Sequence, residues 1–171
     1  MARALPLHAV NPQAALATNA PLILHTRLEE LYQFTPFIAD PAKVEELHNM
    51  RIAAKRLRYT MEVFATVFDS KEFTRLYDQV KSVQERIGDI HDADVRVPLL
   101  QAFLDTHVAS RPEIRVGLEH LIAAQQAARA ASYSSFMLYW NKLQKQGFKR
   151  NFLQLLVQTE MLPNAEHVPV E

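Results

Sequence analysis

The chain has 171 residues, three glycines and no cysteine, and its 19 basic and 19 acidic side chains balance. The lack of cysteine excludes disulfides and thiolate chemistry, and the scarcity of glycine excludes a phosphate-cradling Gly-rich loop. No apolar stretch approaches the roughly 18 residues needed to span a bilayer, and the N-terminus is too short and interrupted for a secretory signal, so we expect one cytoplasmic domain.

Capping residues, prolines and apolar spacing predict helices in the first half of the chain at residues 20–38, 41–68 and 70–88. Asp40 followed by Pro41 is a typical helix start, because aspartate caps the free backbone N–H groups and proline suits the first helical position. The third helix reaches Gly88, where it either bends or continues to Pro98.

The second half of the chain is predicted to form helices at residues 99–108, 112–146 and 148–160. Gly147 is suited to end the longest of them, since glycine readily adopts the left-handed conformation that follows a helix. No alternating strand pattern of useful length occurs, so we expect an all-α bundle with long antiparallel helices. The division predicted is an N-terminal tail at 1–19, a helical domain at 20–160 and a C-terminal tail at 161–171.

The second predicted helix carries cations beside an apolar face. Residues 47–61 contain four cations and no acid. At 100° per residue, seven apolar residues share one face: Leu47, Met50, Ala54, Leu57, Met61, Phe64 and Phe68. His48, Arg51, Lys55 and Arg58, which we call the basic stripe, share the flank of that face over about 15 Å, whereas Arg56 projects to the opposite side. This length suits an extended polyanion.

The cations of the basic stripe repel one another, because like charges three or four residues apart on a helix cost some tenths of a kcal/mol per pair. Only Arg58 has an acid one turn ahead, Glu62. An anionic ligand would offset the repulsion. Acids from a neighbouring helix, or solvent around an exposed face, are the alternatives.

A second acid-free region lies near the C-terminus. Residues 120–159 contain five cations and no acid, whereas residues 62–119 contain eleven acids. The five cations are Arg129, Lys142, Lys145, Lys149 and Arg150. The charge pattern is therefore that of a locally basic site on a neutral protein.

The acidic segment 89–94 allows a metal site to be considered, with His48 as a further ligand. However, His91 and Asp92 are adjacent and cannot point the same way from a helix, whereas His91 and Asp94 can share a face. We interpret Asp94, with Asp89 as a second candidate, as a carboxylate that orients arginines of the basic helix, and we predict no metal and no cofactor.

Nucleic acid is the other polyanion that the basic stripe could contact. Proteins that bind single strands also present aromatic side chains on which bases stack. Here Tyr59 alone lies near the basic face, while the other aromatic residues recur at core spacing. No helix-turn-helix pattern stands out, so the sequence does not favour a nucleic-acid partner.

Two segments of the chain carry extended motifs. Residues 48–59 have the pattern His-x-x-Arg-x-x-x-Lys-Arg-Leu-Arg-Tyr, and residues 84–95 have Gln-x-x-Ile-Gly-x-x-x-Asp-Ala-Asp-Val. In combination they resemble the CHAD family of α-helical domains. A later Trp-x-x-Leu at 140–143, followed by Phe-Lys-Arg at 148–150, fits the end of such a domain. The resemblance covers roughly residues 20–160. It implies a helical module that binds inorganic polyphosphate and has no known catalysis of its own.

Carried over by position, the resemblance implies phosphate contacts from Arg51, Lys55 and Arg58, with His48 as an additional donor. Arginine can hold two phosphate oxygens in its planar fork, while lysine acts as a point charge. The full set of candidate polyphosphate-binding residues is His48, Arg51, Lys55, Arg56, Arg58, Lys81, Arg129, Lys149 and Arg150.

A typical family member is about twice as long and contains two similar four-helix bundles around a basic channel. Here the basic motif occurs once, so we predict that two chains pair as a homodimer to complete the channel. The function expected is non-catalytic binding of inorganic polyphosphate. A structural interaction module, a metal-dependent phosphohydrolase and an RNA-binding protein are the alternatives.

Overall fold

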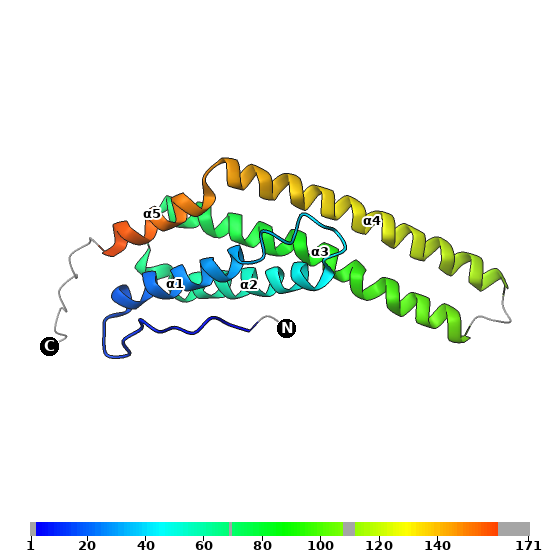
Figure 1. Cartoon of the computed structure of the whole chain (residues 1–171), viewed down its shortest axis with the longest axis horizontal. Coiled ribbons are helices and arrows are strands. Elements are labelled where there is room, and N and C mark those ends of the chain that lie inside the picture. The colour runs from blue at the N-terminus through cyan, green and yellow to red at the C-terminus, as the bar shows by residue number, and fades with distance from the viewer. Residues whose placement is uncertain (1–2, 69, 108–111, 161–171) are drawn as a thin grey trace.

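The computed structural model describes residues 3–68, 70–107 and 112–160, and over these ranges the fold is entirely helical, with no strand (Figure 1). The five α-helices and one short 3-10 turn are α1 (Leu16–Tyr32), α2 (Val44–Val63), η1 (Ala65–Val67), α3 (Lys71–His107), α4 (Pro112–Lys145) and α5 (Phe148–Glu160). The predicted all-α class is therefore confirmed. Residues 161–171, expected as a C-terminal tail, lie outside the described residues.

The bounds predicted for the first two helices are wrong. α1 begins earlier than predicted and contains Pro21, which is buried within the helix. It ends at Tyr32, after which backbone hydrogen bonds close a series of turns up to Lys43. The Asp40 carboxylate accepts the N–H of Ala42 at 2.9 Å, so it caps one of these turns, and α2 begins only at Val44.

α3 is a single helix of 37 residues, about 55 Å long, that passes through Gly88 and Pro98 without interruption. The separate helix expected at 99–108 is therefore its last part. Ser70 caps the start, since its hydroxyl accepts the N–H of Phe73 at 3.0 Å.

The body of the molecule is formed by α1, α2, α5 and the adjoining halves of α3 and α4, which enclose one apolar core. All seven apolar residues predicted for the inner face of the second helix are buried. The largest buried side chains on the other helices include Phe136 and Trp140 of α4 and Phe148 and Phe152 of α5. Packing of this face fixes the direction in which α2 presents its basic stripe.

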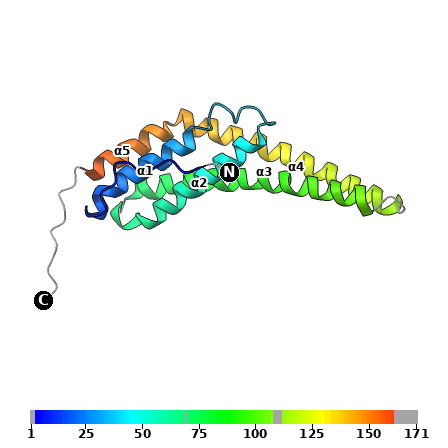
Figure 2. The same cartoon turned by 60° about the horizontal axis from the view of Figure 1, so that its bottom comes forward.

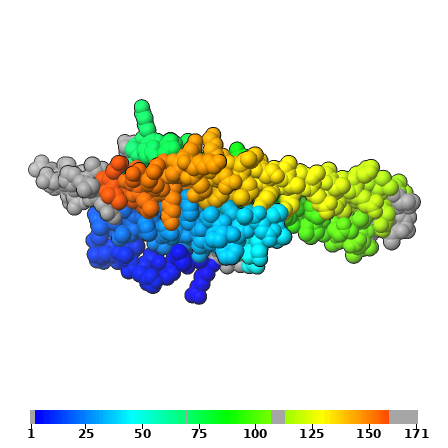
Figure 3. All heavy atoms as spheres, turned by 45° about the horizontal axis from the view of Figure 1, so that its top comes forward, coloured from blue at the N-terminus to red at the C-terminus, as the bar shows by residue number. Residues whose placement is uncertain are grey.

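The end of α3 and the start of α4 project from the body as an antiparallel pair, which we call the arm (Figures 1 and 2). Its two helices are held together by a small separate cluster of Leu104 and Ile122, with Val97, Leu100 and Leu118 packed around them. In the space-filling view the arm extends well beyond the N-terminal and C-terminal helices (Figure 3). No helix of the described ranges has the length and apolar content needed to cross a membrane.

Candidate polyanion site

The basic stripe of α2 runs along α3, and three contacts fix the antiparallel register of the two helices. His48 meets His91, Arg51 lies against Gly88, and Glu62 accepts a hydrogen bond from Tyr77. Between these contacts, moving a given number of residues forward along α2 corresponds to moving the same number of residues backward along α3. The same register places Lys55 level with Gln84.

The same register also places Arg58 level with Lys81 and so adds a cation of α3 to the stripe. The Lys81 side chain is 48% exposed, and its ammonium is 3.9 Å from Glu85 one turn on. At this separation and exposure the ion pair is weak. Lys81 therefore remains accessible to a ligand that follows the stripe.

Arg51 lies against Gly88 along the line where α2 and α3 meet, which we call the α2–α3 groove and define by His48, Arg51, Gly88 and His91. Its Nε atom is 3.7 Å from the position that a Cβ on Gly88 would take. The same nitrogen is buried and has no hydrogen-bond partner. Within the described ranges no carboxylate lies at ion-pair distance from Arg51 or Lys55, so acids of a neighbouring helix do not neutralise these two cations.

Tyr59 brings two cations of the stripe together. The Arg58 guanidinium is 4.7 Å and the Lys55 ammonium 5.6 Å from the centroid of its ring, which is 46% exposed. Both contacts are of the cation–π type. Arg58 also reaches Glu62, with Nε 3.3 Å from the nearer carboxylate oxygen.

Glu62 closes the C-terminal end of the stripe with Tyr77 of α3, whose hydroxyl donates to its carboxylate at 2.7 Å. This hydrogen bond raises the pKa of Tyr77, with smaller contributions from burial and from the charge of Glu62. The phenol therefore stays protonated and holds the carboxylate in place.

The opposite end of the stripe is formed by His48 and His91. Their Nδ1 atoms are 3.2 Å apart, and their ring centroids are separated by 4.4 Å. Burial lowers the pKa of His48, and the charges of His91 and Arg51 lower it further. The stripe thus ends in a pair of imidazoles in which His48 resists protonation.

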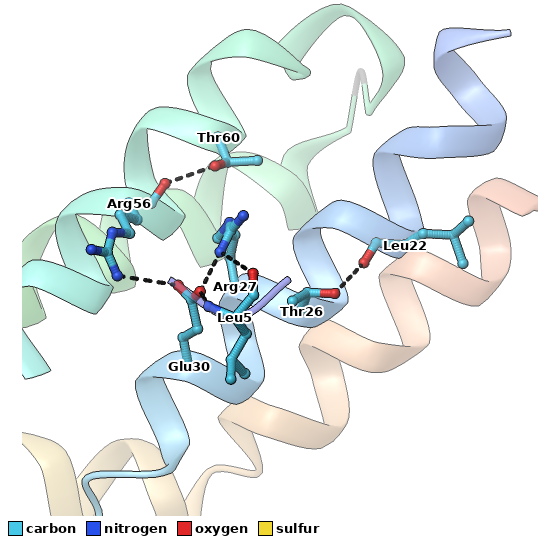
Figure 4. A network of polar contacts seen from close by, with 7 residues as sticks. All are labelled: Leu5, Leu22, Thr26, Arg27, Glu30, Arg56 and Thr60. Atoms are coloured by element: carbon cyan, nitrogen blue, oxygen red, sulfur yellow. Dashed lines mark hydrogen bonds and ion pairs between the residues drawn. The ribbon is translucent and has the colours of Figure 1, made fainter. Parts of the chain in front are cut away.

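Arg56 points toward Glu30 of α1 (Figure 4), in agreement with the helical angle that places it on the side of α2 opposite the stripe. Its guanidinium is 3.9 Å from the buried carboxylate of Glu30 on α1. That carboxylate also pairs with Arg27 and accepts the backbone N–H of Leu5. Arg56 therefore joins α2 to α1 and to the N-terminal segment.

Arg129 is held by groups other than those of the stripe. Its Nε is 2.5 Å from Asp94 of α3, and a terminal nitrogen donates to the carbonyl of Pro41 at 2.9 Å. Asp94 was expected to orient arginines of the basic helix. That expectation is wrong, because Asp94 pairs with an arginine of α4.

The two cations at the start of α5 also lie apart from the α2–α3 groove. The Lys149 ammonium is 2.7 Å from Glu29 of α1 and lies over the ring of Tyr32. Arg150 is exposed and lines an open surface cavity of about 760 Å³ on α5. The structure therefore brings together five of the nine candidates, namely His48, Arg51, Lys55, Arg58 and Lys81.

The residues considered as metal ligands, His91, His48 and Asp92, do not converge on one point. His91 meets His48, while Asp92 pairs with Arg96 at 3.2 Å. Within the part of the chain that the structure describes, no group of three or more His, Cys, Asp or Glu side chains lies together in a way that could hold a metal ion.

Sequence reasoning did not assign Gly88 or His91 to the polyanion site, although it considered His91 and His48 together as ligands of a metal. Gly88 and His91 both stand on α3 at helical spacing from Lys81, at positions 81, 84, 88 and 91. This spacing indicates that the four residues share one face of α3. It assigns them to the site only when the register of α3 against α2 is known.

Comparison with known proteins gives a family. A model of the CHAD domain matches residues 2–101. The match includes α1, α2 and most of α3, and thus both helices that form the basic groove. Neither the curated proteins nor the solved structures returned a significant match. Since the matched region is more than half of the sequence and contains the residues of the groove, the chain belongs to the CHAD family.

Proposed function

We propose that this protein binds inorganic polyphosphate along the basic stripe of α2 and the adjoining Lys81, without catalysing a reaction. The observation that carries the proposal is the lack of a carboxylate partner, among the described residues, for Arg51 and Lys55. The two side chains stand one turn apart on a helix whose other face is anchored in the core. Membership of the CHAD family supports the same ligand.

The mechanism is electrostatic. A phosphate chain along the stripe would replace the mutual repulsion of the cations with attraction, and it would release the counterions that condense on both partners. Arg51 can offer the N–H groups of its planar fork, and Lys55 adds a point charge. Because Arg58 already holds Glu62 at 3.3 Å, it must share its guanidinium with that carboxylate or exchange it for phosphate.

The test is a titration with polyphosphate of defined length at two salt concentrations, comparing the parent with Arg51→Ala/Lys55→Ala/Arg58→Ala. We expect binding that weakens steeply with salt and is lost in the triple variant, whose circular dichroism stays helical. The matched control is Arg75→Ala/Arg96→Ala/Arg115→Ala, which removes the same charge from exposed pairs with acids. Equal loss in both variants would show that net charge alone matters, and the stripe would then not be the site.

RNA is the alternative ligand that this experiment must separate. Tyr59 is the exposed ring beside the stripe, and Lys55 and Arg58 already lie against it. We therefore expect polyphosphate to outcompete single-stranded RNA of equal charge. Competition on equal terms would indicate a general polyanion binder.

A homodimer and a cytoplasmic location belong to the same proposal. The chain contributes one basic stripe, and the apolar residues exposed on its arm offer a surface for a second copy. Sedimentation at micromolar concentration tests the dimer. A protein that is strictly monomeric there would contradict it.

A further inference from the structure

The His48–His91 pair is placed where a ligand on the basic stripe would reach it. His48 stands one turn before Arg51 on α2, and both imidazoles are partly buried between α2 and α3. With their Nδ1 atoms 3.2 Å apart, one ring must donate a hydrogen and the other must accept it. The contact therefore holds one proton between the two facing nitrogens.

A second proton cannot enter the pair without changing it. Two protonated rings would direct two N–H donors at each other across 3.2 Å. A phosphate oxygen beside the pair relieves this conflict if the two rings turn, because each N–H group can then donate to the anion instead of facing the other. The fully protonated pair is thus poorly suited to the free protein and well suited to an occupied site.

The charged groups around the pair give its protonated form little net support. On α2, Arg51 disfavours the charged form of His48, and Glu45 is the acid that favours it. On α3, Asp94 stands one turn beyond His91, but its carboxylate is engaged by Arg129 of α4. Asp92, next to His91, is paired with Arg96. The free protein therefore offers the protonated pair little compensation from acids.

We propose that His48 and His91 form a phosphate-binding element that takes up a proton when polyphosphate occupies the stripe, so that affinity increases as the pH falls. The inference rests on the proposed function and adds His91 to the binding residues. It assigns to this end of the stripe a response to pH in the range where histidine titrates.

The sign of the effect follows from linkage. Burial and neighbouring positive charge hold the pKa of His48 below its usual value in the free protein. Bound phosphate supplies negative charge and raises that pKa. Since the complex then binds more protons than the free protein, lowering the pH favours the complex.

The experiment is calorimetric titration of the full chain with long-chain polyphosphate, in which end groups are few. We expect affinity about tenfold higher at about pH 5.5 than at about pH 7.5. Repeating the titration near pH 6.5 in buffers of different ionisation enthalpy should show net uptake of up to about one proton per site. In His48→Gln/His91→Gln both effects should disappear, because glutamine keeps a donor but does not titrate.

His25→Gln is the matched control, since His25 is exposed on α1 and lies outside the groove. This variant should keep the pH dependence of the parent. If His48→Gln/His91→Gln fails to fold, nuclear magnetic resonance of the parent tests the inference instead. The ring resonances of His48 should titrate at higher pH once polyphosphate is added, and unchanged His48 resonances in the bound parent would overturn the inference.

The outcomes separate the two proposals. Binding that is salt-sensitive but independent of pH, or a pH dependence retained by the glutamine pair, overturns the inference and leaves the proposed function standing. Absence of binding by the folded parent at either pH overturns both.

Discussion

Arg51 of α2 faces Gly88 of α3, where the small residue leaves room for the arginine side chain. A Cβ at that position would be in ordinary van der Waals contact with Nε of Arg51, at 3.7 Å, so a methyl group fits. A longer side chain would occupy the space through which the guanidinium passes. The glycine therefore controls how deeply the arginine can lie in the groove.

Substitutions at Gly88 should separate stability from binding. Gly88→Ala should stabilise the fold by about 0.5–1 kcal/mol, because glycine is costly inside a helix, and should leave polyphosphate affinity unchanged. Gly88→Leu should displace Arg51 and weaken binding about tenfold, which is the loss of one charge-assisted hydrogen bond of about 1.5 kcal/mol. Urea unfolding and titration measure the two effects.

Gly117→Leu serves as the control for this pair, because nothing lies within 4 Å of a Cβ at that position in the arm. It should bind polyphosphate as the parent does. If Gly88→Leu also binds normally, the guanidinium does not need its place in the groove.

The residues of the site differ in how far the sequence alone could place them. The side to which Arg56 points follows from its helical angle, and the structure confirms it. The contact between His48 and His91 depends on the register of two helices, and the sequence does not state that register. Asp94 was assigned to the wrong arginine for the same reason, since its partner comes from α4.

At the scale of elements, Glu30 joins three parts of the fold. Its carboxylate is 1% exposed and is shared by Arg27 of its own helix, Arg56 of α2 and the backbone of Leu5 (Figure 4). The motif that supplies the basic stripe thus also supplies, through Arg56, a tie between α1 and α2. Removing the acid would leave two arginines beside a position that no longer carries a negative charge.

Glu30→Ala should therefore lower the free energy of unfolding by about 3 kcal/mol, the usual cost of breaking a buried ion pair from one side. The neighbouring Glu29→Ala is the control. Glu29 and its partner Lys149 are each 38% exposed, so its loss should cost less than about 1 kcal/mol. Chemical denaturation of both variants tests the difference, and similar small losses would show that the network around Glu30 adds little to stability.

The helices themselves were easier to predict than their ends. Gly88 left open whether α3 bends, because a glycine costs a helix only about 1 kcal/mol relative to alanine. Packing against the core keeps α3 continuous through Gly88, since Val83, Ile87 and Ile90 are buried on either side of the glycine. The predicted start at residue 20 is wrong because the first helix continues through Pro21, which is buried inside it.

At the scale of the whole molecule, the arm presents apolar side chains that the body does not cover. Val95, Leu99 and Phe103 recur every four residues along α3 and are 45%, 64% and 49% exposed. Apolar residues gathered in this way are typical of a surface that meets another protein. A second copy fits because one helical stripe can pack against itself about a two-fold axis.

We therefore predict that Leu99→Lys/Phe103→Lys converts the proposed homodimer into a monomer without loss of helical signal, as measured by sedimentation or light scattering. Leu138→Lys is the control, because Leu138 is 74% exposed on α4 outside this stripe and should not affect association. Polyphosphate titration of the monomeric variant then shows what pairing contributes. If two stripes complete one channel, the variant should bind more weakly than the parent, whereas equal affinity would show that the groove between α2 and α3 of a single chain is sufficient.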